Sequence, residues 1–308
     1  QTSRTYLVSL KKFLQFIVRD KRHNKYSDET VRAYARDMVD DLANWSKSYK
    51  NQIGIQTAVK RLKQLDVLMT NEKMYKYKCS QQYISAIKLF ADCDSVSFNL
   101  NVRKFSLMRN FLLFNINVNN ANRAGVLSEL TVKDFKERQM TMGSEGGEVF
   151  IITILYHKTL GACGPAKLVL NEQLEFKMRQ YLSFVRDKLP EIEKTDAFFT
   201  TYAGTPLNGS SAVGMSISRH SAASGLGHMT SNDCRRSAST ASYLINDGEN
   251  SPAVSTLMNH SEGVAKKVYR LTTKDQEAVK ATRFLSSFYD GSVKPENIPI
   301  VKGEFPSF

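Results

Sequence analysis

The sequence predicts a mainly α protein with a small β-sheet, an α+β fold in two domains. Apolar residues recur at helical spacing over most of the 308 residues, while a nearly continuous β-branched and aromatic run at 148–156 and a second strand pattern at 167–170 predict a β-hairpin. A polar link near residues 92–100 separates two parts of different character. A chain of this length can bury a core in each of two domains. We therefore expect a helical domain over 1–95, a second domain over 97–290 and a C-terminal arm over 291–308.

The first domain is expected to consist of four helices. Apolar positions predict a helix over 4–18, and Ser27 before two acidic residues predicts the start of a helix through Trp45. Two more helices are expected over 55–69 and 80–90. Basic residues recur along the faces of these helices, which suits contact with a phosphate backbone but equally describes ordinary solvated faces. The candidate DNA-binding residues here are Arg32, Arg36, Lys60, Arg61 and Lys63.

The second domain is expected to combine helices with one β-hairpin. Residues 102–118 predict a helix, and two β-rich runs at 148–156 and 167–170 predict the hairpin. Six further helices are expected over 172–188, 210–223, 233–245, 251–258, 265–271 and 274–288. The tail from Gly291 has three prolines and no helical period, so we expect it to dock on another surface, such as a neighbouring subunit.

The composition favours a nucleic-acid partner and argues against several other classes. The net charge is +13, and in residues 1–100 Lys and Arg outnumber Asp and Glu by 18 to 10. Such an excess favours a polyanion, although a merely basic protein remains the alternative. The four cysteines form no C-x-x-C pair, so we expect reduced thiols, no metal site and no cofactor. No apolar run suits a membrane span, and a start at Gln1 suggests that the chain is part of a longer protein.

Five candidate catalytic residues follow one another in a suggestive order along the second domain. Arg123 follows the helix over 102–118, Lys158 lies at the tip of the hairpin, and Arg235 lies at a helix start. His260 then precedes Tyr269 by nine residues. Each of these residues alone is more often a surface or core side chain, so the order carries the hypothesis.

This order resembles the tyrosine recombinase (phage integrase-like) family, including the crypton-type elements of eukaryotes. The resemblance covers most of the chain and implies a helical core-binding domain followed by a catalytic domain. It implies that Tyr269 is the nucleophile, that Arg123, Arg235 and His260 stabilise the transition state, and that Lys158 is the general acid. Arg236, beside the second arginine, is a further candidate DNA contact.

The sequence departs from the family pattern at three positions. Asn232, a sixth candidate catalytic residue, occupies the place of the usual histidine three residues before Arg235. Val126 stands where many members have an acidic residue, and Asn259 stands where the glycine of Gly-His-Ser is usual. Asn232 weakens a proton-transfer role and leaves an amide that can still contact phosphate.

The resemblance implies site-specific recombination or integration of double-stranded DNA, as in a transposon, without ATP or metal. It also implies a homodimer or homotetramer on DNA that exchanges C-terminal arms, in the nucleus of a eukaryote or the cytoplasm of a bacterium. Two alternatives remain open: a catalytically inactive, domesticated DNA-binding protein, and a monomeric type IB topoisomerase-like enzyme. Relaxation of supercoils without a recombinant product would identify the topoisomerase-like enzyme. The target sequence cannot be read from the chain because it depends on base-edge contacts and DNA deformability.

We predict that affinity for double-stranded DNA falls steeply with salt, with a log–log slope of roughly −0.9 for each phosphate neutralised. The physical reason is release of counterions by the lysine and arginine excess. Fluorescence anisotropy of a labelled duplex between low and physiological salt measures the slope. A flat response would argue against DNA as the ligand.

Overall fold

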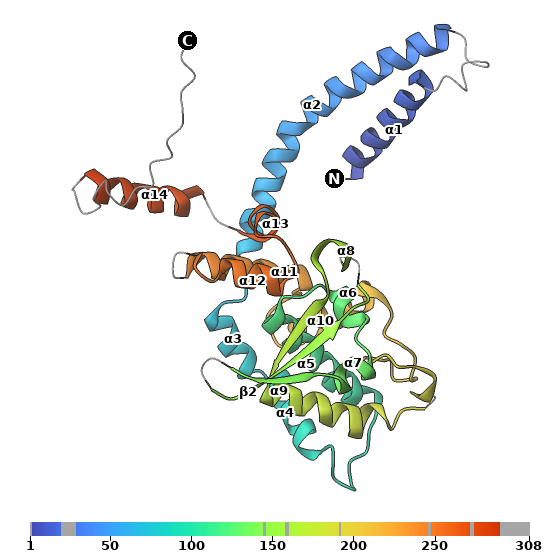
Figure 1. The fold of residues 1–308 in the computed structure, drawn as a ribbon, viewed down its shortest axis with the longest axis vertical. Helices are drawn as coiled ribbons and strands as arrows, with labels where there is room; N and C mark the ends of the chain where they lie inside the picture. The colour runs from blue at the N-terminus through green and yellow to red at the C-terminus, as the bar shows by residue number, and fades with distance from the viewer. Residues whose placement is uncertain are drawn as a thin grey trace. The chain divides into compact units, whose positions relative to one another are not determined.

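The computed structural model describes residues 2–19, 29–143, 146–157, 160–190, 192–245, 248–271 and 274–289. The chain divides into two compact units, Gln1–Asp66 and Val67–Phe308 (Figure 1). The predicted arm over 291–308 and the expected cap at Ser27 lie outside the described residues.

The first unit is a hairpin of two helices, α1 (Thr2–Arg19) and α2 (Glu29–Leu65), which pack along each other. Leu14, Ala35 and Leu42 form their small shared core. The sequence pattern predicts two helices over the span of α2, which is wrong because the helix continues through Gly54. A single exposed glycine lowers helix stability by only about 1 kcal/mol, and no proline interrupts the span.

The second unit contains the remaining helices of the described chain. Most predicted helices are confirmed, while those expected at 172–188 and 265–271 contain π-helical segments. The helices are α3 (Asn71–Lys78), α4 (Gln81–Asp92), α5 (Val102–Asn120), α6 (Ala124–Ser128), α7 (Val132–Lys136), α8 (Leu160–Cys163), α9 (Glu172–Gln180), the π-helical η2 (Tyr181–Arg186), the 3₁₀ turn η3 (Ile192–Lys194), α10 (Gly209–Ala223), α11 (Ser231–Leu244), α12 (Ser251–Leu257), α13 (Glu262–Val264), the π-helical η5 (Ala265–Tyr269) and α14 (Lys274–Tyr289).

A three-stranded antiparallel sheet with the order β1-β2-β3 accompanies these helices. The predicted hairpin is confirmed as β2 (Glu148–Ile154) and β3 (Ala166–Asn171), with Ile152 opposite Leu168. Alternate residues of β3 are buried, as a strand with one face on a core requires. The edge strand β1 (Gln139–Met142) was not predicted, because its alternation of polar residues with Met140 and Met142 spans only four residues, all of them exposed.

Helix α5 runs through the middle of the second unit (Figure 1). From Phe105 to Asn120, buried side chains occur on all sides of the helix, with Phe105, Leu112 and Ile116 fully covered. A helix that is apolar on all sides is stable only when other elements surround it, and α4, α9, α10, α11 and β3 all pack against α5. The asparagine-rich C-terminal end of α5 is thereby held inside the unit.

The division between the units lies at residue 66 rather than at the domain boundary expected after residue 95. Residues 67–95 belong with the second unit because Tyr77 of α3 and Phe90 of α4 share one hydrophobic core with Phe111 and Phe114 of α5. The polar link at 92–100 therefore joins two helices of one core.

A polar network is buried inside this core, between α3, α5 and α10. The Tyr77 hydroxyl accepts a hydrogen bond from Asn115 Nδ2 at 2.7 Å and lies 3.0 Å from His220 Nε2. Burial lowers the pKa of His220 to about 4 from its ordinary value near 6.5. The imidazole is therefore neutral in the folded protein at neutral pH.

We predict that the buried His220 lowers the free energy of unfolding as the pH decreases from about 6.5 to 4. Because the folded pKa lies below the unfolded one, the unfolded chain binds the extra proton in this window; stability is full above 6.5 and decreases as pH falls through 4. The total loss is about 3 kcal/mol. Urea unfolding of wild type and His220→Phe across this range measures it. Equal pH slopes for the two proteins would contradict the prediction.

Candidate active site

Tyr269 ends the π-helical segment η5 and lies in a small cluster with two other candidate residues. Its side chain is buried and packs with Ala121 and Met258. The centre of its ring lies 5.1 Å from that of His260, and the guanidinium carbon of Arg235 lies 4.7 Å from the ring centre. A cation over a phenol ring is attracted to the negative face of the ring. His260 and Tyr269, nine residues apart in the sequence, are therefore in contact in the structure.

Arg235 is fully buried on α11 and is held by two main-chain carbonyls. Its Nη1 donates to Ala121 O at 2.8 Å, and its Nη2 donates to Met258 O at 3.0 Å. Burial lowers the pKa of the guanidinium, while the neighbouring Tyr269 acts in the opposite direction. In the described part of the chain, Nε makes no hydrogen bond. The guanidinium therefore keeps an unused donor beside Tyr269.

Arg123 and His260 form the other side of the cluster. Arg123 is the N-terminal flanking residue of α6, and its Nη2 lies 3.1 Å from Nε2 and 3.4 Å from Nδ1 of His260. Burial, Arg235 and Arg123 together lower the pKa of His260 to about 4. The ring is therefore neutral near pH 7, so one nitrogen can accept from Arg123 while the other retains a proton to donate.

The backbone before His260 adopts an uncommon conformation. Asn259 has a φ of +56°, in the left-handed region. Asparagine is one of the few residues with a side chain that tolerates this region readily. Asn259 Nδ2 also donates to Gly164 O at 3.3 Å, which ties this turn to the segment before β3.

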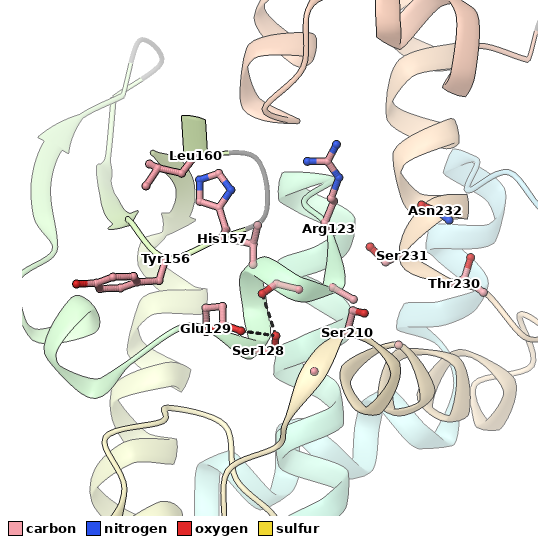
Figure 2. A pocket seen from close by; sticks show the side chains of 15 residues that line it. Arg123, Ser128, Glu129, Tyr156, His157, Leu160, Ser210, Thr230, Ser231 and Asn232 are labelled. Carbon is pink, nitrogen blue, oxygen red and sulfur yellow. Dashed lines mark hydrogen bonds between the residues drawn. The ribbon is translucent and has the colours of Figure 1, made fainter. Parts of the chain in front are cut away.

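A cleft of about 830 Å³ opens beside Arg123. Figure 2 shows Tyr156, His157 and Leu160 on one side of it, and Thr230, Ser231 and Asn232 on the other. The N-terminal residues of α10 and α11 line this cleft together with Arg123. Helix N-termini carry partial positive charge and free amide donors, so the cleft suits an anion.

The structure brings together four of the six predicted catalytic residues: Arg123, Arg235, His260 and Tyr269. Asn232 is exposed and lines the cleft. Lys158 lies outside the described residues.

The predicted DNA-binding residues are spread over both units. Arg32 and Arg36 both pair with Glu29, at 3.1 and 2.8 Å, and Arg236 pairs with Asp233 at 2.9 Å. Lys60 and Lys63, further along α2, are exposed. The side chain of Arg61 lies outside the described part of the chain. The carboxylate of Glu29 therefore partly neutralises the positive charge of Arg32 and Arg36 near the N-terminus of α2.

Sequence reasoning missed the buried polar residues around Arg123. Asn117, Asn120 and Asn122 are almost completely buried and bond to main-chain groups of neighbouring elements. The only signal in the sequence was a run of asparagines directly before Arg123, which reads equally well as a polar loop.

Among the described residues, no cluster of three or more His, Cys, Asp or Glu side chains is arranged to hold a metal ion. The described helices include none with the length and hydropathy needed to cross a membrane. All four cysteines are free thiols, of which Cys93 and Cys234 are buried.

The comparisons with known proteins include a distant structural similarity. No protein-family model matches the chain, and no curated protein matches it. The structure is similar to the crystal structure of XerA recombinase, with 13% sequence identity and a TM-score of 0.41 over 90% of this chain and 83% of that chain. A similarity of this extent assigns neither an activity nor site residues.

We predict that Arg123→Gln raises the pKa of His260 above about 4, because one of the two cations that oppose its protonation is removed. The rise is partial, since burial and Arg235 remain. Titration of the histidine ring resonances by NMR measures the change. Arg103→Gln, at an exposed position of α5, is the matched control. An unchanged His260 titration in Arg123→Gln would contradict the predicted electrostatic contact.

Proposed function

We propose that the chain is a DNA strand-transfer enzyme of the tyrosine recombinase type, which cuts and rejoins double-stranded DNA through a 3′-phosphotyrosine at Tyr269. The observation that carries the proposal is the contact of Tyr269 with Arg235 and His260, continued by the contact of His260 with Arg123. A nucleophile, two cations and a neutral hydrogen-bond donor thus lie within one cluster.

This arrangement suits attack on a phosphodiester. A phenol with an ordinary pKa of about 10 is ionised about one part in a thousand at pH 7, a free-energy difference of about 4 kcal/mol. Neighbouring guanidinium groups can hold the non-bridging oxygens of a phosphodiester bidentately. They also stabilise the charge that develops on the non-bridging oxygens, where one preorganised donor is typically worth about 10²–10³ in rate.

The bond changes balance without a cofactor. The phenol oxygen of Tyr269 bonds to phosphorus as the bond from phosphorus to the 5′ oxygen breaks. The phenol releases its proton to solvent, and the departing 5′ oxygen gains one proton, which Lys158 is proposed to donate. Attack by a 5′ hydroxyl on the phosphotyrosine reverses these changes, so rejoining needs no external energy source.

The cleft beside Arg123 supports the proposal because its lining suits a DNA phosphate. Its walls carry Arg123 and the first residues of α10 and α11, which suit a phosphate of the DNA backbone. The N-terminus of α10 has no side-chain cap and no acidic residue in its first turn, so its amide donors are not engaged by a local carboxylate.

A second candidate function is DNA binding without cleavage, and the burial of Tyr269 favours it. Tyr269 is only 9% exposed, so a phosphodiester reaches its phenol oxygen only if neighbouring groups move. The exposed Asn232 in place of a histidine favours the same alternative.

Because Tyr269 is buried, the proposed recombinase requires that DNA binding open the site around η5.

We predict that wild-type protein forms a covalent adduct with a nicked suicide DNA substrate, and that Tyr269→Phe forms none. The reason is that the variant lacks the attacking oxygen while it keeps the ring that contacts Arg235 and His260. A candidate terminal sequence serves as the substrate, and a denaturing gel reports the DNA-shifted band. Tyr75→Phe, at an exposed position of α3, is the matched control and should retain the adduct.

Each other outcome has a defined meaning. An adduct that survives Tyr269→Phe excludes Tyr269 as the nucleophile and directs attention to Tyr156, which lines the cleft. Salt-sensitive DNA binding without an adduct on any of a panel of sequences supports the second candidate function.

A further inference from the structure

Three asparagines beside Arg123 are buried although their amides are strongly polar. Asn117 and Asn120 lie in the last turns of α5, and Asn122 lies in the short loop before Arg123. Each is at most 1% exposed. A buried amide is unfavourable unless it is hydrogen-bonded, so the partners of these side chains indicate what they contribute.

Two of the asparagines bond to the open edge of β3. Asn120 Oδ1 accepts from Val169 N at 2.6 Å, and Asn120 Nδ2 donates to Val169 O at 3.0 Å. Asn122 Nδ2 donates to Lys167 O at 2.9 Å. The two asparagines are two residues apart, and so are their partners, as on one edge of a strand. Their side chains thus satisfy main-chain groups that a fourth strand would otherwise pair.

The third asparagine ties the same loop to α11. Asn122 O accepts from Asn117 Nδ2 and from Ser231 Oγ, both at 2.8 Å, and Asn117 Nδ2 also lies 3.2 Å from Ser231 Oγ. Ser231 is the first residue of α11, one turn before Arg235. The loop that ends at Arg123 is therefore fixed to the helix that carries Arg235.

Between these anchors the backbone of Ala121 is strained. Its φ of +50° lies in the left-handed region, where a residue other than glycine costs roughly 1–2 kcal/mol. The strained peptide orients Ala121 O toward Arg235 Nη1, and the Ala121 methyl packs with Tyr269. Anchors on both sides of Ala121 keep the backbone in this conformation.

We propose that Asn117, Asn120 and Asn122 are positioning residues, which fix the 121–123 loop against β3 and α11 so that Arg123 and Arg235 face His260 and Tyr269. Their effect on catalysis rests on the proposed function. Their effect on the geometry of the cluster does not.

The pKa of His260 reports this geometry without DNA, because Arg123 and Arg235 both lower it. In Asn120→Ala and Asn122→Ala, we expect NMR titration to give a higher pKa for His260 than the wild-type value. Asn122→Ala deletes a single hydrogen bond, so it decides the test if Asn120→Ala does not fold. Asn115→Ala is the matched control: it lies on the same helix and bonds to Tyr77, and we expect it to leave the His260 titration unchanged.

Single-turnover adduct formation at saturating DNA is the second measurement. We expect both variants to react on the order of 100-fold more slowly than wild type, as for a displaced catalytic group, with unchanged DNA affinity. A wild-type His260 titration in both folded variants would overturn the proposal, as would wild-type reaction rates. A shifted His260 titration in the variants, with no adduct from wild type on any substrate, would support the positioning network and refute strand transfer.

Discussion

The burial of one positive charge, the guanidinium of Arg235, is the constraint on which the site depends. A charge inside a protein is unfavourable unless it is compensated, and no described carboxylate pairs with this one. Two carbonyls and the Tyr269 ring surround it instead. Because the carbonyls belong to residues 121 and 258, the guanidinium is accommodated only when two distant segments meet. The compensation is also incomplete, which makes an incoming phosphate oxygen a favourable partner.

Burial and the two arginines also determine which side chains of the cluster are charged. Burial of His260, together with the nearby Arg235 and Arg123, disfavours its protonation, so its pKa of about 4 leaves the imidazole neutral. The positive charge that faces a substrate then comes from the arginines alone, and His260 contributes hydrogen bonds. Because an arginine stays protonated over the whole physiological range, the charge of the cluster is insensitive to pH near neutrality.

The parts of this arrangement that the sequence predicted are those with local signals. Helical periodicity predicted α5 and α11, β-branched runs predicted β2 and β3, and the order of cations predicted the residues that meet at Tyr269. The parts that were missed depend on contacts between distant segments. A buried asparagine at the end of α5 looks like a polar surface residue until β3 lies beside it, and the placement of α3 and α4 depends on which core Tyr77 and Phe90 join.

The three departures from the recombinase pattern differ in physical weight. Asn259 has a left-handed backbone, which asparagine adopts more readily than most other residues with a side chain, so asparagine fits the conformation observed at this position. Val126 is buried in the apolar core, where a carboxylate would need a partner that valine does not, so the core around α6 is stabilised differently. Asn232 differs in chemistry: it lies exposed in the cleft, and a side-chain amide can hydrogen-bond an anion but cannot exchange a proton with it. Proton transfer in the proposed reaction therefore depends on residues other than Asn232.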